Sequence, residues 1–361
     1  MATERPSIDR TAVEAFQEQV FEAALGTFTT YALYLGSRLG YYDALADAGP
    51  STSDELAAAT GTDERYAREW LEQQTVVGVL TCENPAADLD ARRFSLPTAH
   101  TTVLTDPDNP DYLASLPRTV VGALSPIDGV ADVYRTGEGI PYEAFGEDMH
   151  EGQAALNRPL FATELGAEWL PSLTDVDERL RAGGRVADVG CGHGWSSIAI
   201  ARAYPEATVH GIDADAASVE RARENAAASD AGDRLSFTHA DAADVAGSYD
   251  LVTAFECVHD MSDPVAVLST MRSLALPDGT VLVMDERVGE SFAPDAGPVE
   301  EFMYGWSVFH CLPVGMVDDG VGTGTVMREE TLRAYATDAG FSGVEVLPIE
   351  NEFFRFYRLT L

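Results

Sequence analysis

The chain contains no lysine: all 23 of its basic residues are arginine, against 60 aspartate and glutamate residues, and its formal net charge is −37 over 361 residues. The absence of lysine excludes Schiff-base chemistry and a lysine general base. The shortage of positive charge argues against a nucleic-acid partner, because binding to phosphates needs a basic surface. So large a negative charge repels itself at low ionic strength and is screened at high salt, which indicates a protein adapted to high salt.

Cysteines and long apolar runs are also scarce. The four cysteines are widely scattered, with no pair at zinc-ligand spacing and no pattern of a disulfide framework, so no metal site is expected. No apolar run approaches the roughly 20 residues of a membrane-spanning helix, and the N-terminus has no signal-peptide pattern. These absences predict a cytoplasmic protein with no membrane association. The cysteines are Cys82, Cys191, Cys257 and Cys311.

The most informative motif lies at residues 186–196. A short apolar run that contains Asp188 is followed by three glycines at alternate positions, Gly190, Gly192 and Gly194, and then by a helical run. A strand, a tight glycine turn and a helix N-terminus are the parts of a nucleotide-type site. Trp195 occupies the position at which the dinucleotide fingerprint needs a small residue, and this disfavours a nicotinamide cofactor.

Strand-like and helical runs alternate after the glycine motif. This rhythm predicts a parallel sheet with helices on both faces, whose ligands lie beyond the carboxyl ends of the strands. Asp213 and Asp241 stand at two of these ends, at which a carboxylate can accept from ribose hydroxyls or from an adenine amino group. The strand-like runs are 207–213, 235–242, 249–256 and 279–285, and the helical runs are 216–228 and 264–275.

The order and spacing of these motifs resemble class I S-adenosylmethionine-dependent methyltransferases over roughly residues 176–361. Two strand-like runs at 344–348 and 353–361, with a link of three or four residues, suit the antiparallel hairpin that ends this fold. The resemblance implies a doubly wound, seven-stranded Rossmann-like sheet and S-adenosylmethionine as cofactor. The acid excess without lysine also resembles proteins of halophilic archaea.

The resemblance also implies roles for single residues of the cofactor site. The three glycines would let the backbone approach the methionine part, Asp188 would orient its ammonium group, and Asp213 would hold the ribose. Asp241, followed by Ala242, would meet the adenine. Phe255 would flank the cofactor beyond the fourth strand.

His259 is the candidate general base for an oxygen acceptor, which must lose a proton before or during methyl transfer. Its setting is similar to the His-Asp-Trp-Ser-Asp stretch of small-molecule O-methyltransferases, with Met261 in place of tryptophan. Asp260 could orient the imidazole, and a purely structural role for His259 in its loop stays open. His310 is an alternative base. It lies in an aromatic insertion at 286–328 that suits an apolar acceptor pocket and ends in a glycine-rich stretch at 315–324, a candidate flap.

The first 105 residues predict a separate helical module. Helical runs at 13–25, 28–39, 51–57 and 62–71 precede a wing at 82–104, and the whole resembles the winged-helix domain of small-molecule O-methyltransferases. The second helix of the predicted winged motif is rich in acids, which argues against DNA binding. The resemblance implies that this module serves dimerisation instead. Residues 106–175 read as a helical linker, with a longer helix at 151–170, before the catalytic domain at 176–361.

The sequence therefore predicts methyl transfer from S-adenosylmethionine to a small-molecule acceptor, with oxygen ahead of nitrogen or carbon, in a homodimer. Three alternatives stay open: a nicotinamide-dependent oxidoreductase, a winged-helix regulator that senses S-adenosylmethionine without catalysis, and a methyltransferase acting on RNA or protein.

Overall fold

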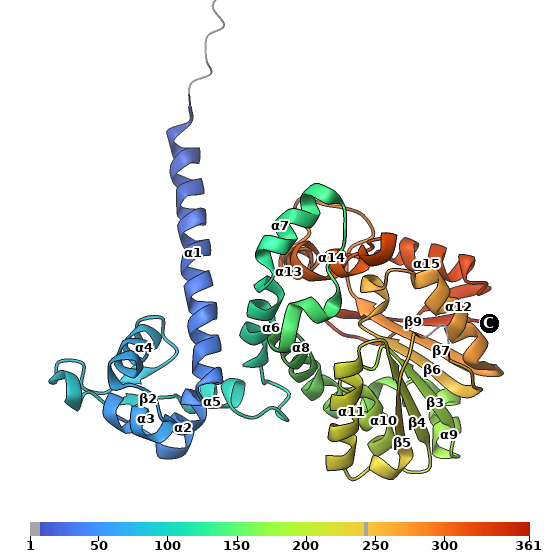
Figure 1. Ribbon diagram of the computed structural model, residues 1–361, viewed down its shortest axis with the longest axis horizontal. Helices are drawn as coiled ribbons and strands as arrows, with labels where there is room; N and C mark the ends of the chain where they lie inside the picture. The colour runs from blue at the N-terminus through green and yellow to red at the C-terminus, as the bar shows by residue number, and fades with distance from the viewer. Residues whose placement is uncertain (1–7, 242–244) are drawn as a thin grey trace, which may run out of the picture. The chain divides into compact units, whose positions relative to one another are not determined.

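The computed structural model describes residues 8–241 and 245–361, and the chain divides into two compact units, Met1–Val121 and Gly122–Leu361 (Figure 1). Within the described ranges, no helix is long and apolar enough to cross a membrane. Ala242, which the sequence places at the adenine, lies outside the described residues.

The first unit is mainly helical. The two helical runs predicted at 13–25 and 28–39 form one helix, α1 (Arg10–Arg38), because Gly26 between them keeps helical geometry. Side chains cap the N-termini of the two helices after α2: Thr52 forms a capping box with Glu55, and Asp63 caps the next helix. The following helices are α2 (Tyr41–Ala48), α3 (Ser53–Thr60) and α4 (Glu64–Val76).

A two-stranded wing follows these helices. Strand β1 (Thr81–Cys82) pairs antiparallel with β2 (Phe94–Ser95), and the 3-10 turn η1 (Leu89–Ala91) lies between them. The predicted extension of the wing to residue 104 is wrong, because the chain forms helix α5 (Thr98–Leu104) there. The core of this unit contains Trp70, on which two nearly inaccessible tyrosine rings, Tyr41 and Tyr42, pack edge-on.

Helices lead from the wing to the sheet. They are α6 (Ser115–Leu124), α7 (Ile127–Thr136), the short turn η2 (Tyr142–Phe145), α8 (Gly146–Leu160), the π-helical segment η3 (Phe161–Trp169) and α9 (Thr174–Arg181). The longer helix predicted at 151–170 is thus α8 continued by η3. The change of hydrogen-bond pattern follows Pro159, which lacks a backbone N–H and cannot continue the α-helical ladder.

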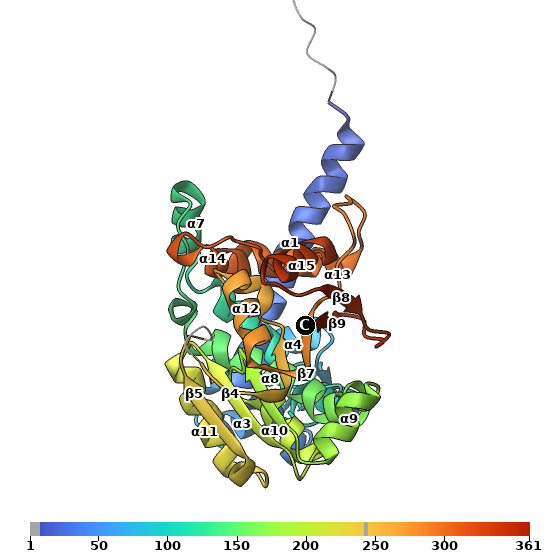
Figure 2. The same ribbon diagram turned by 90° about the vertical axis from the view of Figure 1, so that its right-hand side faces the viewer.

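The predicted doubly wound, seven-stranded sheet forms the second unit (Figure 2). Its order is β5-β4-β3-β6-β7-β9-β8. Pairing is parallel from β5 to β7 and antiparallel at β9 and β8. The strand order reverses between β3 and β6. In such sheets ligands bind in the crevice at this point, outside the carboxyl ends of the strands. The parallel strands are β3 (Arg185–Val189), β4 (Thr208–Asp213), β5 (Leu235–His239), β6 (Tyr249–Phe255) and β7 (Ala275–Glu286).

Alternate side chains of the central strands enter separate cores on the two faces of the sheet. On one face Val186 and Leu251 pack with η3 and α10 (Trp195–Ala203). On the other face Ala187 and Val252 pack with α12 (Pro264–Leu274) and α15 (Glu329–Asp338). Helix α11 (Ala216–Ala228) contributes to a smaller core beside β5. Because both faces are covered, the glycine turn after β3 opens only at the carboxyl edge of the sheet.

The end of the chain forms the predicted antiparallel hairpin from β8 (Gly343–Val346) and β9 (Phe354–Thr360). Residues 347–353 link the two strands, so the expected link of three or four residues is too short. The insertion after β7 contains α13 (Pro298–Trp306), the π-helical turn η7 (Ser307–Cys311), α14 (Leu312–Gly315) and the turn η8 (Val317–Asp319).

Candidate active site

The glycine loop joins β3 to α10 in a conformation that favours glycine. Gly190, Gly192 and Gly194 have φ angles of 69°, 50° and 79°, in the left-handed region where a side chain is strained. The backbone N–H of Gly190 donates to the carbonyl of Ile212 at 2.9 Å, and Gly194 caps the N-terminus of α10. The loop is therefore held against β4 before its helix begins.

Two of these glycines differ in what surrounds them. A Cβ atom on Gly190 would lie 2.6 Å from Sγ of Cys257, so the chain leaves no room there. A Cβ atom on Gly192 would meet nothing within 4 Å. The backbone at Gly192 therefore faces open space at the carboxyl edge of the sheet, where a ligand can approach it.

Asp188 is buried, and side-chain hydroxyls engage both of its carboxyl oxygens. Ser196 and Ser197 donate to Oδ2, each at 2.6 Å, and Thr253 donates to Oδ1 at 2.8 Å. Burial raises the pKa of this carboxyl, and the three hydrogen bonds act in the opposite direction. The residue thus links β3, α10 and β6 beneath the glycine loop.

Asp213 lies at the end of β4 and is only partly buried. Its Oδ2 accepts from the backbone N–H of Gly192 at 2.7 Å, and its Oδ1 accepts from that of Asp215 at 2.9 Å. Burial raises the pKa of Asp213, against these hydrogen bonds. Each oxygen keeps a further lone pair for a ligand. Asp241 follows β5 and is exposed.

Phe255, the last residue of β6, is buried in the core. Its ring lies 5.8 Å from that of Phe161 in η3. Trp195, at the start of α10, is partly buried, and the guanidinium of Arg158 stacks over its ring at 4.2 Å. The indole therefore fills the space beside the helix start that the dinucleotide fingerprint reserves for a small residue.

His259 follows β6 in the short turn η6 (Val258–Asp260) and is 3% exposed. Its Nδ1 lies 2.9 Å from Oδ1 of Asp285, within hydrogen-bond distance, and also 2.9 Å from Oε2 of Glu286. Both acids stand at the end of β7, the strand beside β6. The carboxyl bonded to the imidazole is thus that of Asp285 rather than that of the adjacent Asp260.

The protonation of this triad follows from its burial. Burial raises the pKa of Glu286 well above its usual range; the charge of His259 acts against this, and the charge of Asp285 adds to it. The pKa of Asp285 is lowered, since hydrogen bonds from Glu286 and His259 and the charge of His259 outweigh its burial. For His259, burial lowers the pKa, but the charges of Glu286 and Asp285 outweigh it and raise the pKa well above 6.5.

The same three residues could hold a metal ion, since their ligand atoms lie within 4.8 Å of one another. The contact between Nδ1 and Asp285, however, has the length of an N–H···O hydrogen bond. A ring N–H that donates to Asp285 explains the contact and leaves Nε2 free to accept a proton.

The insertion brings further groups to His259. The thiol of Cys311 lies against the imidazole. Burial lowers the pKa of neighbouring His310 to about 3, so His310 would be a weak base. The stretch expected as a flap is hydrogen-bonded in place: Val321 donates its backbone N–H to Ser262, and Gly322 to Gly315.

Sequence reasoning missed Asp285, Glu286 and Glu256. Asp285 and Glu286 end β7, the strand beside β6. Their place at the carboxyl end of a predicted strand was the feature of the sequence that could have marked them as site residues. Glu256 directly follows β6, and it accepts hydrogen bonds from Gln153 and Asn157 of α8.

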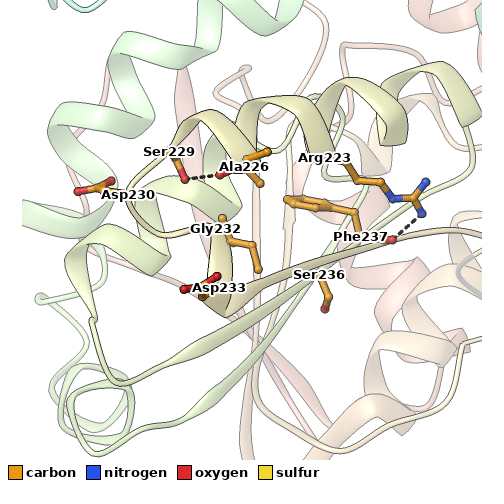
Figure 3. A pocket seen from close by; sticks show the side chains of 10 residues that line it. Arg223, Ala226, Ser229, Asp230, Gly232, Asp233, Ser236 and Phe237 are labelled. Atoms are coloured by element: carbon orange, nitrogen blue, oxygen red, sulfur yellow. Dashed lines mark hydrogen bonds between the residues drawn. The ribbon is translucent and has the colours of Figure 1, made fainter.

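A hollow of about 540 Å³ lies elsewhere, between the end of α11 and β5 (Figure 3). Its lining includes Arg223, whose guanidinium donates to the carbonyl of Phe237, together with Asp230 and Asp233. None of the predicted site residues lines it, so it is not the candidate active site.

Two family models match the chain. Residues 180–325 match a methyltransferase domain, and residues 27–106 match an Rv2258c-like winged helix-turn-helix domain. The matched ranges contain the glycine loop with His259 and the α2–α4 helices with the wing, respectively.

Known proteins with similar sequences include a 27-O-demethylrifamycin SV methyltransferase from Amycolatopsis mediterranei. It is 37% identical over 152 residues, which cover 40% of this chain and 53% of that protein. A ubiquinone biosynthesis O-methyltransferase from Psychrobacter arcticus is 36% identical over 106 residues, or 28% of this chain and 40% of that protein. The chain thus spans about half the length, or less, of these curated relatives.

Solved structures match over nearly the whole chain. The mitomycin 7-O-methyltransferase MmcR has a TM-score of 0.71 at 21% identity, with 98% of this chain and 99% of that chain covered. This likeness shows a Rossmann-like fold preceded by a winged helical domain, and the matches to a methyltransferase domain and to a winged helix-turn-helix domain fall within these two parts.

Proposed function

We propose that this chain transfers the methyl group of S-adenosylmethionine to an oxygen atom of a small molecule, with His259 as general base. The observation that carries the proposal is the buried pairing of His259 with Asp285 at the carboxyl edge of a methyltransferase sheet. The relatives named above are O-methyltransferases of small molecules, which supports oxygen as the acceptor atom.

The residues of the glycine loop fit the cofactor. Gly192 offers backbone beside open space, and Asp213 offers carboxyl lone pairs to ribose hydroxyls. Both carboxyl oxygens of Asp188 already accept hydrogen bonds from hydroxyls, so we assign Asp188 to holding the loop and α10. It can contact the methionine ammonium group only through lone pairs that these hydroxyls leave free. Asp241 with Ala242 at the adenine, and Phe255 flanking the cofactor, complete the proposed site.

The bound cofactor would supply an electrophilic methyl group, and the chain supplies orientation and a base. Asp285 accepts the Nδ1 proton of His259 and fixes the ring, so that Nε2 can take the proton of the acceptor hydroxyl. The ionised carboxyl of Asp285 then stabilises the positive charge of the resulting imidazolium. Burial of the ring keeps water from competing for the base.

The N-terminal unit is proposed to form a homodimer through α1. Large apolar side chains along this helix are exposed, among them Phe16, Phe21 and Phe28 at 64%, 64% and 70%. Exposed apolar surface of this kind marks a protein interface. On α4, Arg65 and Arg68 pair with Glu69 and Glu64, which leaves little positive charge for DNA. The functional division proposed is residues 1–105, 106–175 and 176–361.

The acid excess supports a second proposal, that the protein works at high salt. The described ion pairs join arginines to nearby acids, but 60 acids face only 23 arginines along the chain. The uncompensated carboxylates repel one another until salt screens them.

The function is tested by calorimetric binding of S-adenosylhomocysteine in molar KCl to the wild type, to Asp213→Ala and to the exposed control Glu350→Ala. We expect micromolar binding that Asp213→Ala weakens roughly 10-fold or more, since a charged hydrogen-bond acceptor is lost. Glu350→Ala should bind like the wild type. Absence of binding to folded wild type would contradict the proposal, and binding without turnover on any oxygen acceptor would favour a cofactor-sensing regulator.

A further inference from the structure

Glu256 has an unusual backbone conformation next to the proposed base. It follows β6 directly, lies three residues before His259 and has a φ angle of 56°, in the left-handed region that non-glycine residues rarely adopt. Its backbone N–H still donates to the carbonyl of Met284 at 2.8 Å, continuing the ladder to β7. Strained residues held by their surroundings cluster at ligand sites, where the strain aims a side chain.

Two amides from one face of α8 hold the side chain. Gln153 Nε2 donates to Oε1 at 3.2 Å, and Asn157 Nδ2 donates to Oε2. The two amides are four residues apart, so they lie one turn from each other on the helix. They occupy one lone pair on each oxygen and leave the others available.

Solvent reaches this clamp. Glu256, Gln153 and Asn157 are all only partly buried, unlike the His259 triad behind them. Gln153 and Asn157 are neutral amides, and both donate to the carboxyl of Glu256. The carboxyl is therefore a hydrogen-bond acceptor held by two neutral amides, placed at the same strand end as the base.

We propose that Glu256 is a specificity-determining residue that accepts a hydrogen bond from a second hydroxyl or amino group of the acceptor, while His259 serves the hydroxyl that is methylated. The inference rests on the proposed function and narrows its substrate class. The acceptor is a compound with at least two hydrogen-bond donors near one another, such as a dihydroxy aromatic. A compound with only the methylated hydroxyl leaves Glu256 without its partner.

The charge of the carboxyl supports this assignment. Burial raises the pKa of Glu256 to about 7. The charge of His259 and the hydrogen bonds from Asn157 and Gln153 lower this pKa, and the charge of Asp285 raises it. Above this pKa the ionised carboxylate accepts only. Below it one oxygen carries a proton and competes with the acceptor's donor. Preference for a two-donor acceptor should therefore strengthen as the pH rises through about 7.

The test compares acceptors rather than absolute rates. Catechol and resorcinol, each with two hydroxyls, and phenol, with one, are offered with labelled S-adenosylmethionine to the wild type, Glu256→Gln and the exposed control Glu345→Gln. For wild type and control, kcat/KM for a dihydroxybenzene exceeds that for phenol. In Glu256→Gln this ratio falls roughly 10- to 100-fold, the loss of one charged hydrogen bond, and no longer depends on pH. Phenol turnover and affinity for S-adenosylhomocysteine change little.

Three results would overturn the inference. The first is an equal loss on all three probes by Glu256→Gln, which would mean that Glu256 only shapes the loop. The second is an unchanged ratio. The third is a wild type that binds S-adenosylhomocysteine but prefers neither dihydroxybenzene to phenol. Failure to bind S-adenosylhomocysteine is a different result, because it removes the proposed function itself.

Discussion

Nδ1 of His259 lies 2.9 Å from Oδ1 of Asp285, although the two residues stand on different strand ends and 26 positions apart. Parallel pairing of β6 with β7 brings the ends of these strands together, and the turn η6 aims the imidazole back toward β7. The contact fixes which ring nitrogen holds the proton, and therefore which nitrogen can act as base.

Replacing Asp285 with asparagine should lower kcat roughly 100-fold, in the range that general-base catalysis contributes. The amide keeps the shape of the side chain, but it no longer supplies a charge to stabilise the imidazolium. Affinity for S-adenosylhomocysteine should stay near that of the wild type. Asp278→Asn, at a largely exposed acid, serves as control. A kcat equal to that of the wild type would separate Asp285 from the chemistry.

The pH profile should show a base whose pKa lies above the ordinary 6.5. The charges of Glu286 and Asp285 raise the pKa of His259 despite its burial, so its protonated form dominates at neutral pH. Only the deprotonated ring acts as base. Hence kcat/KM should rise with pH through this raised pKa and be lost as the pH falls. In Asp285→Asn the rising limb should move to lower pH. A wild-type limb at or below pH 6.5 would contradict the electrostatic argument.

Alanine at Gly190 and at Gly192 should have different effects. At Gly190 the new Cβ would lie 2.6 Å from Sγ of Cys257, in addition to the strain of a φ angle of 69°. We expect a loss of about 2–3 kcal/mol in the free energy of unfolding, measured by denaturant titration, with partial recovery in Cys257→Ala. At Gly192 the space is open, so the loss should be about 1–2 kcal/mol, from strain alone, with weakened cofactor binding. Equal losses would refute the packing argument.

The proposed dimer should depend on α1. Phe21→Glu introduces a charge on the exposed apolar side of this helix and should convert dimers to monomers in light scattering at molar KCl, because each large side chain buried at an interface contributes about 1.5–3 kcal/mol. Tyr66→Glu, at a 79% exposed residue of α4, is the matched control. A wild type that is monomeric at every concentration, or a Phe21→Glu variant that remains dimeric, would exclude this interface.

Stability should increase with ionic strength. Between 0.1 M and 1 M salt the Debye length falls from about 10 Å to about 3 Å, which screens the repulsion among the excess carboxylates. We expect the midpoint of thermal unfolding to rise by several degrees or more from 0.1 M to molar KCl. The same shift in NaCl but a smaller one in sucrose would assign it to screening. Superimposable melting curves in the two KCl concentrations would argue against salt adaptation.

The sequence by itself determined the fold class and the cofactor loop. Three glycines at alternate positions after an apolar strand predict a tight turn, because glycine has no side chain and tolerates the left-handed conformation that Gly190, Gly192 and Gly194 adopt. Strand-like runs that alternate with helical runs predict the doubly wound sheet, because few other arrangements bury both faces of a parallel sheet. Element bounds were less determined: 98–104 formed a helix rather than part of a wing, since local patterns do not decide where a short strand ends.

Only the tertiary structure decided the partners of the polar side chains. Asp285, Glu286 and Glu256 read as ordinary acids in a chain rich in them, and adjacent Asp260 was the candidate partner for His259. The pairing of β6 with β7 brings Asp285 to the imidazole of His259. The position of α8 brings Gln153 and Asn157 to the carboxyl of Glu256. Hydrogen bonds form over about 3 Å between groups from distant segments, and that proximity is a property of the folded chain, which local patterning does not encode.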